Sequence, residues 1–87
     1  MIMSTQEVYE FIGELAISLY SKKIKISLSA LNAILKDKNA EYGSNRGLAS
    51  GVSAAYRFWK DKDPVVHHAI AYTFNDKDGE PAWSKYE

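Results

Sequence analysis

The chain has 87 residues, no cysteine, 46% hydrophobic residues and equal numbers of basic and acidic side chains, 11 Lys and Arg against 11 Asp and Glu. This length allows a single domain, 1–87, and the aromatic-rich composition with zero net charge is typical of a folded chain. The absence of cysteine excludes disulfides and zinc–thiolate sites. No run of about 18 apolar residues occurs, and the N-terminus lacks a basic region followed by an apolar stretch, so we expect a cytoplasmic protein without a membrane span.

Two helices are predicted in the first part of the chain. Ser4 followed by Glu7 forms the pattern of a capping box, which predicts the start of the first helix. Its apolar face is predicted to carry Val8, Phe11, Ile12, Leu15 and Leu19. Residues 24–26 form a short alternating piece, and Ser27 is a plausible N-cap for a second helix. The inward face of that helix is predicted to carry Leu28, Leu31, Ile34 and Leu35.

A third helix is predicted after a polar connection of about ten residues, starting near Asn45 or Arg46 and ending at 60. Its apolar residues recur at the spacing of one helix face: Leu48, Val52, Ala55, Tyr56 and Trp59. A narrow polar stripe lies on the opposite face and consists of Arg46, Ser50, Ser53, Arg57 and Lys60. The pattern therefore predicts a helix with one packing face and one small, basic, hydrogen-bonding face.

A fourth helix is predicted from Asp63 as N-cap and Pro64 at the first helical position. Its apolar face would carry Val66, Ala69, Ile70, Thr73 and Phe74. A strand is the competing interpretation of 70–74, because apolar and small residues alternate there, and we expect a helix with an extended end. The polar run 75–80 is a turn signal, and 82–86 can return as a strand limited to an edge by Pro81. The expected fold class is mainly α, with three to four helices and a small β-hairpin.

Motifs that would indicate catalysis or metal binding fail on their spacing. His67 and His68 are adjacent, so they point in different directions and cannot easily share one metal ion. If Gly79 is taken as the sixth position of a calcium loop, the first and twelfth positions fall on Phe74 and Lys85, which cannot serve as ligands. The glycines between 43 and 51 match neither a nucleophile elbow nor a phosphate loop. We expect no catalytic residue, no metal and no cofactor, and hence no enzyme.

The zero net charge hides an uneven distribution along the chain. Residues 1–20 carry three Glu and no Lys or Arg, and residues 61–87 carry six acidic against three basic side chains. Residues 21–60 carry eight basic against two acidic side chains, and the polar stripe lies within them. A basic, small-residue helix face can lie in a DNA groove or against an acidic partner.

Three helices followed by a hairpin with a polar tip resemble the winged helix-turn-helix class. The segments YGSNRGLASGVSAAYRFW and FNDKDGEPAW are also similar to short bacterial and phage proteins, and the likeness covers residues 26–84. The resemblance implies that the third helix is the recognition element and that 75–80 is the tip of the wing. Two features depart from the class: the connection 36–47 exceeds a tight turn, and an acidic wing would repel phosphate.

These observations give two functional hypotheses. The first is a small DNA-binding or regulatory protein that contacts double-stranded DNA through 46–60 and can act as a homodimer. The second is a protein–protein interaction module of the same fold, which binds a protein partner and no nucleic acid. Its contacts would include exposed aromatic residues such as Phe58, Tyr72 or Tyr86.

Overall fold

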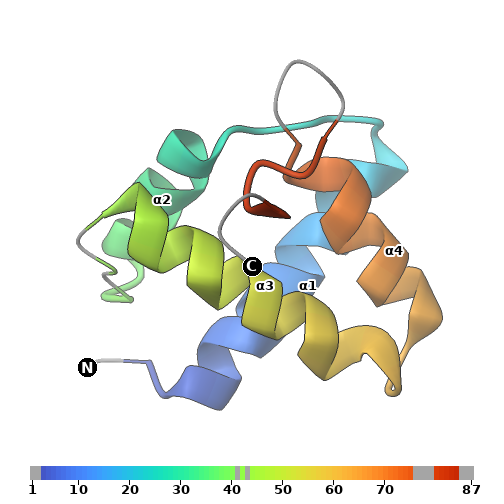
Figure 1. Cartoon of the computed structure of the whole chain (residues 1–87), viewed down its shortest axis with the longest axis horizontal. Helices are drawn as coiled ribbons and strands as arrows, with labels where there is room; N and C mark the ends of the chain where they lie inside the picture. Colours follow the sequence, from blue (N-terminus) through green and yellow to red (C-terminus); the bar gives the residue numbers. More distant parts are fainter. Residues whose placement is uncertain (1–2, 41, 43, 76–79, 85–87) are drawn as a thin grey trace.

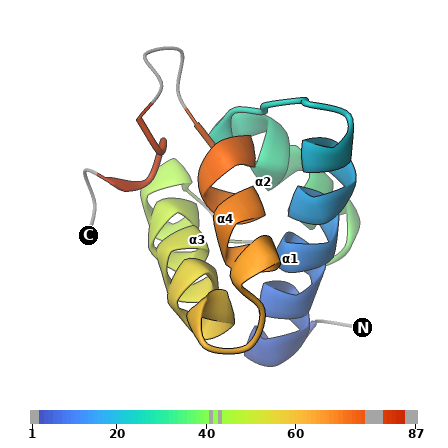
Figure 2. The same ribbon diagram turned by 90° about the vertical axis from the view of Figure 1, so that its right-hand side faces the viewer.

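The computed structural model describes residues 3–40, 42, 44–75 and 80–84. Four helices follow one another in these residues: α1 (Thr5–Ser21), α2 (Leu28–Asp37), α3 (Asn45–Lys60) and α4 (Pro64–Thr73). α1, α3 and α4 pack against one another, and α2 packs on α3. In Figure 1, α2 lies at one end of this bundle, and in Figure 2 α4 lies nearest the viewer, with α3 and α1 to either side of it. The prediction of a mainly α fold is therefore confirmed.

Every helix begins at a polar cap. Ser4 accepts a hydrogen bond from the Glu7 N–H at 3.2 Å, and the Glu7 side chain accepts one from the Ser4 N–H at 3.0 Å, which confirms the capping box. Ser27 caps α2 as predicted, and Ser44 caps α3. Asp63 accepts from the Val65 N–H at 3.0 Å, and Pro64 occupies the first position of α4. These caps satisfy backbone N–H groups that have no partner within the helix.

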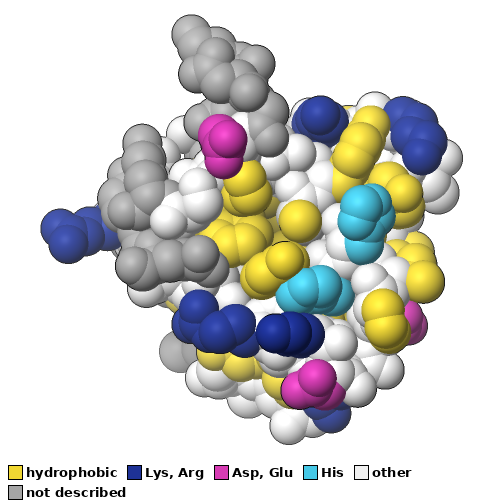
Figure 3. Space-filling view, turned by 45° about the vertical axis from the view of Figure 1, so that its right-hand side comes forward, with side chains coloured by type: hydrophobic (Ala, Val, Ile, Leu, Met, Phe, Trp, Pro, Cys, Tyr) yellow, Lys and Arg dark blue, Asp and Glu magenta, His cyan; other side chains and the backbone are white. Residues whose placement is uncertain are grey.

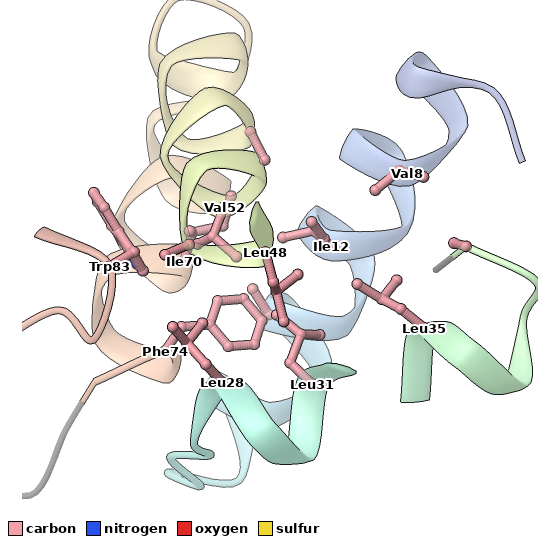
Figure 4. Packing of buried hydrophobic residues seen from close by; sticks show 14 of the residues in the cluster. Val8, Ile12, Leu28, Leu31, Leu35, Leu48, Val52, Ile70, Phe74 and Trp83 are labelled. Atoms are coloured by element: carbon pink, nitrogen blue, oxygen red, sulfur yellow. The ribbon is translucent and has the colours of Figure 1, made fainter. Parts of the chain in front are cut away.

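The core lies where the four helices meet. Figure 4 shows Phe74, from the end of α4, pointing into the same space as Leu28 of α2 and Leu48 of α3. Ile12 of α1 and Ile70 of α4 are fully buried in the same cluster. On α1, small residues also face inward: Gly13 and Ala16 are buried, whereas Phe11, Leu15 and Leu19 are only half-buried. Close approach of α1 to its neighbours explains this difference from the predicted face.

The segment predicted as the end of a helix or a strand is helical to Thr73, so the strand interpretation of 70–74 is wrong. Thr73 is fully buried, and its hydroxyl donates to the Ala16 carbonyl of α1 at 3.2 Å. Its own carbonyl accepts from the Ile26 N–H at 2.9 Å. These two bonds hold the end of α4 between α1 and the connection that leads to α2.

The predicted β-hairpin is not formed by the described residues. They contain one isolated antiparallel bridge, between Asn75 and Pro81, and the Ala82 N–H donates to the Phe74 carbonyl at 3.0 Å. Pro81 has no N–H to donate, and the Ser84 N–H bonds back to the Pro81 carbonyl at 3.0 Å, so the chain turns and no ladder continues. The described residues thus show a single bridge where the sequence predicted two paired strands.

Residues 76–79 of the expected wing tip, 75–80, and the end of its second strand, 85–86, lie outside the described residues. None of the helices in the described part of the chain is long and apolar enough to cross a membrane.

Candidate nucleic-acid interface

α3 is held in place at both ends by neighbouring helices. At its start, the Asn45 side chain donates to the Ser29 hydroxyl of α2 at 3.1 Å. Near its end, the Trp59 indole N–H donates to the Tyr9 carbonyl of α1 at 3.0 Å. The same indole covers Gly13, where a Cβ would lie 2.6 Å from the ring nitrogen. The position of α3 is therefore fixed by contacts to two different helices.

The inward faces of α3 are tightly packed. Leu48, Val52 and Ala55 are fully buried in the core, as the apolar pattern predicts. On another side, the Tyr42 ring lies against Gly51, where a Cβ would approach it to 2.8 Å. Burial raises the pKa of the Tyr42 hydroxyl, and Tyr9 nearby raises it further. Only a narrow part of the surface of α3 remains exposed.

Four residues of the predicted polar stripe lie on this exposed part. They are Arg46, Ser50, Arg57 and Lys60, and we call them the basic edge of α3. The row from Arg46 to Lys60 is about 21 Å long at 1.5 Å per residue. Figure 2 shows α3 on the outside of the bundle, with α1 on the other side of α4. The structure thus brings these four side chains together on one outer surface.

Ser53 does not join the basic edge. Its side chain is buried, with 3% of its surface exposed, and its hydroxyl accepts a hydrogen bond from Arg57 Nη1 at 2.7 Å. Tyr56, about one helical turn after Ser53, packs against Trp83, and the two ring centroids are 4.9 Å apart. The structure therefore places Ser53 under the Arg57 side chain, whereas the other four residues of the predicted stripe are exposed.

Ala54 was not among the predicted site residues. It is half-buried beside the exposed Ser50 on α3, and its methyl group is small enough to allow close approach of a partner. Its position one turn beyond Ser50 is the sequence signal that would have identified it. A small apolar methyl group is also the kind of side chain that contacts the methyl group of thymine.

The two histidines take separate structural positions. His67 Nδ1 donates to the Tyr56 carbonyl at 2.8 Å, and its ring stacks on the Tyr56 ring at 3.7 Å. His68 packs edge-on against Tyr20 of α1 at 5.4 Å. Among the described residues, no group of three or more His, Asp or Glu side chains could hold a metal ion.

Comparison of the chain with protein families, with curated proteins and with solved structures finds no match.

Proposed function

We propose that this protein binds double-stranded DNA through α3, with a regulatory role. The observation that supports this most is the basic edge: three cationic side chains and one hydroxyl lie in a row on the exposed surface of an otherwise packed helix. Cations that neutralise phosphates supply essentially all of the non-specific affinity of proteins for DNA. We also propose that the protein is cytoplasmic, because DNA is accessible in the cytoplasm of bacteria.

The length of the basic edge suits a groove of the duplex. The major groove is about 12 Å wide, and a row of about 21 Å extends beyond it. Arg46 and Lys60, at the two ends, can therefore reach phosphates on either side of the groove. Ser50 lies between them and is short enough to let the helix approach base edges. Ser53 holds Arg57 in the row through its hydrogen bond.

The proposal places the contact on α3 and does not require a wing. Of the winged-helix arrangement, only the recognition helix is proposed here, and that helix is α3. The segment after α4 carries the exposed Glu80 next to the Asn75–Pro81 bridge, and a carboxylate there repels phosphate. A homodimer would present two copies of α3 to two half-sites of a duplex.

Fluorescence anisotropy of a labelled mixed-sequence duplex tests the proposal. The protein is titrated at about 50 mM and 200 mM salt, beside the variant Arg46→Gln/Lys60→Gln. This variant lacks the cationic groups at the two ends of the basic edge. The control Lys22→Gln/Lys36→Gln removes the same charge from exposed positions outside α3. We expect salt-sensitive binding that the α3 variant weakens by on the order of tenfold per lost phosphate contact at 0.1 M salt. Equal binding by the α3 variant and the control would refute the proposal.

A protein partner is the second candidate, and exposed apolar side chains favour it. Among the described residues the exposed large hydrophobic side chains are Val65, in the first turn of α4, at 60% and Ile24 at 41%. The aromatic residues expected at such an interface are less accessible: Phe58 and Tyr72 are half-buried, and Lys62 and Lys25 lie over their rings. Tyr86 lies outside the described residues. Binding to a protein through this apolar surface would respond weakly to salt.

A further inference from the structure

The C-terminal end of α1 contains a residue in an unusual backbone conformation. The Ile24 N–H bonds to the Leu19 carbonyl at 2.9 Å and the Lys23 N–H to the Tyr20 carbonyl at 3.0 Å, which is the Schellman motif. Lys23 has a φ of 58°, in the left-handed region where glycine or asparagine is favoured. The equivalent position after α2 carries Asn39, with a φ of 59°. Lys23 therefore adopts this conformation at a cost that a glycine would not carry.

The lysine side chains of this connection lie over two tyrosine rings. Lys23 Nζ is 4.4 Å from the centroid of Tyr20 and 5.7 Å from that of Tyr72. Lys25 Nζ is 4.7 Å from the Tyr72 centroid, and the two tyrosine rings are 4.9 Å apart. We call these four residues the tyrosine–lysine cluster. Attraction to a ring face restricts the movement of an ammonium group. The group still has N–H donors that can bond to an anion.

The cluster is connected to α3 through the two histidines of α4. His68 packs edge-on against Tyr20 of the cluster, whereas His67 stacks on Tyr56 of α3, next to Arg57. Figure 3 shows this face of the molecule: Lys and Arg side chains gather in separate places, with both histidines and hydrophobic side chains between them. The longest extent of the molecule is 31 Å, which is less than one turn of a duplex, about 34 Å.

We propose that the tyrosine–lysine cluster is a second phosphate-binding site, which contacts the backbone of the same duplex that α3 binds. This inference rests on the proposed function of α3, and it adds a second point at which the protein contacts the duplex. Lys23 and Lys25 are both exposed, and both ammonium groups lie over the Tyr72 ring. Two restricted ammonium groups bind a phosphodiester with a smaller loss of side-chain freedom than two mobile lysines would. Such contacts add affinity and orientation without reading sequence.

The test compares variants of equal charge. Lys23→Asn/Lys25→Gln removes both ammonium groups, and asparagine is compatible with the left-handed position, as Asn39 shows. Lys22→Gln/Lys36→Gln removes the same charge from exposed lysines, and serves as the matched control. Affinity for one labelled duplex is measured by anisotropy at several salt concentrations, and circular dichroism with thermal unfolding verifies that each variant is folded.

We expect the cluster variant to reduce the slope of log K against log salt by about 1.8, since each phosphate contact contributes about 0.9. At 0.1 M salt the same loss weakens binding by roughly 60-fold. The control should change the slope by less than half as much. A cluster variant with the slope and affinity of the control would overturn the inference.

Running Arg46→Gln/Lys60→Gln in the same series separates the two proposals. Weakening by the α3 variant but not by the cluster variant overturns the second site alone and leaves DNA binding by α3 in place. Weakening by the cluster variant but not by the α3 variant would place the phosphate contact at the cluster alone, and would overturn both the role of α3 and the inference that the cluster is a second contact beside it. Absence of salt-sensitive duplex binding by the unmodified protein overturns both.

Discussion

Gly13→Ala tests the contact that fixes the end of α3 on α1. An added Cβ would lie 2.6 Å from Nε1 and 2.7 Å from Cε2 of Trp59, closer than such atoms approach in proteins. The indole is rigid and also donates to the Tyr9 carbonyl at 3.0 Å. The ring must therefore move away from α1, and its hydrogen bond must lengthen or break.

The magnitude follows from two opposing effects. Replacing a glycine by alanine within a helix stabilises by about 1 kcal/mol. Overpacking in a tight contact costs about 1–3 kcal/mol, and a lost hydrogen bond costs about another 1 kcal/mol. We expect Gly13→Ala to lower the free energy of unfolding by about 1–3 kcal/mol. For a domain of this size, Tm falls by roughly 4–8 °C for each kcal/mol.

Chemical denaturation followed by circular dichroism measures this change. Ser18→Ala, at an exposed position of the same helix, is the control and should alter stability by less than about 0.5 kcal/mol. In a Trp59→Leu background the flexible leucine leaves space, so Gly13→Ala should become neutral or stabilising. A Gly13→Ala protein as stable as the unmodified one, with Trp59 present, would refute this account of the α1–α3 contact.

Three further predictions concern single contacts. Hydrogen bonds to the backbone and then to the side chain of Ser4, the N-cap residue, hold the pKa of Glu7 below its usual value of 4.5. The ionised form of Glu7 therefore stabilises the fold above that pH. This contribution is lost as the pH falls through the lowered pKa, and Glu7→Gln should therefore show a smaller loss of Tm on acidification than the unmodified protein. Gly51→Ala should displace the Tyr42 ring, and spectroscopic titration should find the pKa of that phenol returned toward 10.0, whereas an unchanged titration would contradict the contact. Thr73→Val removes the buried bond to the Ala16 carbonyl and should lower the free energy of unfolding by about 1 kcal/mol, measured by denaturation; an equally stable variant would mean that this bond contributes little.

Local signals were sufficient to predict where the helices start. Ser4 with Glu7, Ser27 and Asp63 before Pro64 all cap the helices that they were predicted to cap. Each of these signals acts within three residues of the chain, so no knowledge of tertiary structure is needed to recognise it. The exposure of Arg46, Ser50, Arg57 and Lys60 also follows the helical period.

Contacts between distant segments could not be predicted in the same way. Helical spacing placed Ser53 with the exposed residues, but in the fold Arg57 lies over its hydroxyl and the side chain is buried. The hairpin was inferred from alternation and a polar turn, whereas the buried Thr73 extends α4 through a bond to a residue 57 positions earlier in the chain. The pairing of Lys23 and Lys25 with Tyr72 likewise depends on how α1 and α4 pack.

The contacts of α3 connect the fold to the proposed function. Asn45 fixes its start to Ser29 of α2, and Trp59 fixes its end to α1. A helix that is held at both ends can present its side chains without further ordering, which reduces the entropic cost of binding. Gly13→Ala should therefore weaken duplex binding as well as stability, because it shifts the end of α3 that carries Lys60.

Mapping of backbone amide chemical shifts during titration with a duplex tests the central claim most directly. A ¹⁵N-labelled sample is titrated with a mixed-sequence duplex at about 50 mM salt and the titration is repeated at about 200 mM. The account predicts that the largest shift changes fall on the basic edge of α3, at Arg46, Ser50, Arg57 and Lys60, and that they shrink at the higher salt concentration. Changes confined to the first turn of α4 around Val65, or no changes at either salt concentration, would contradict it.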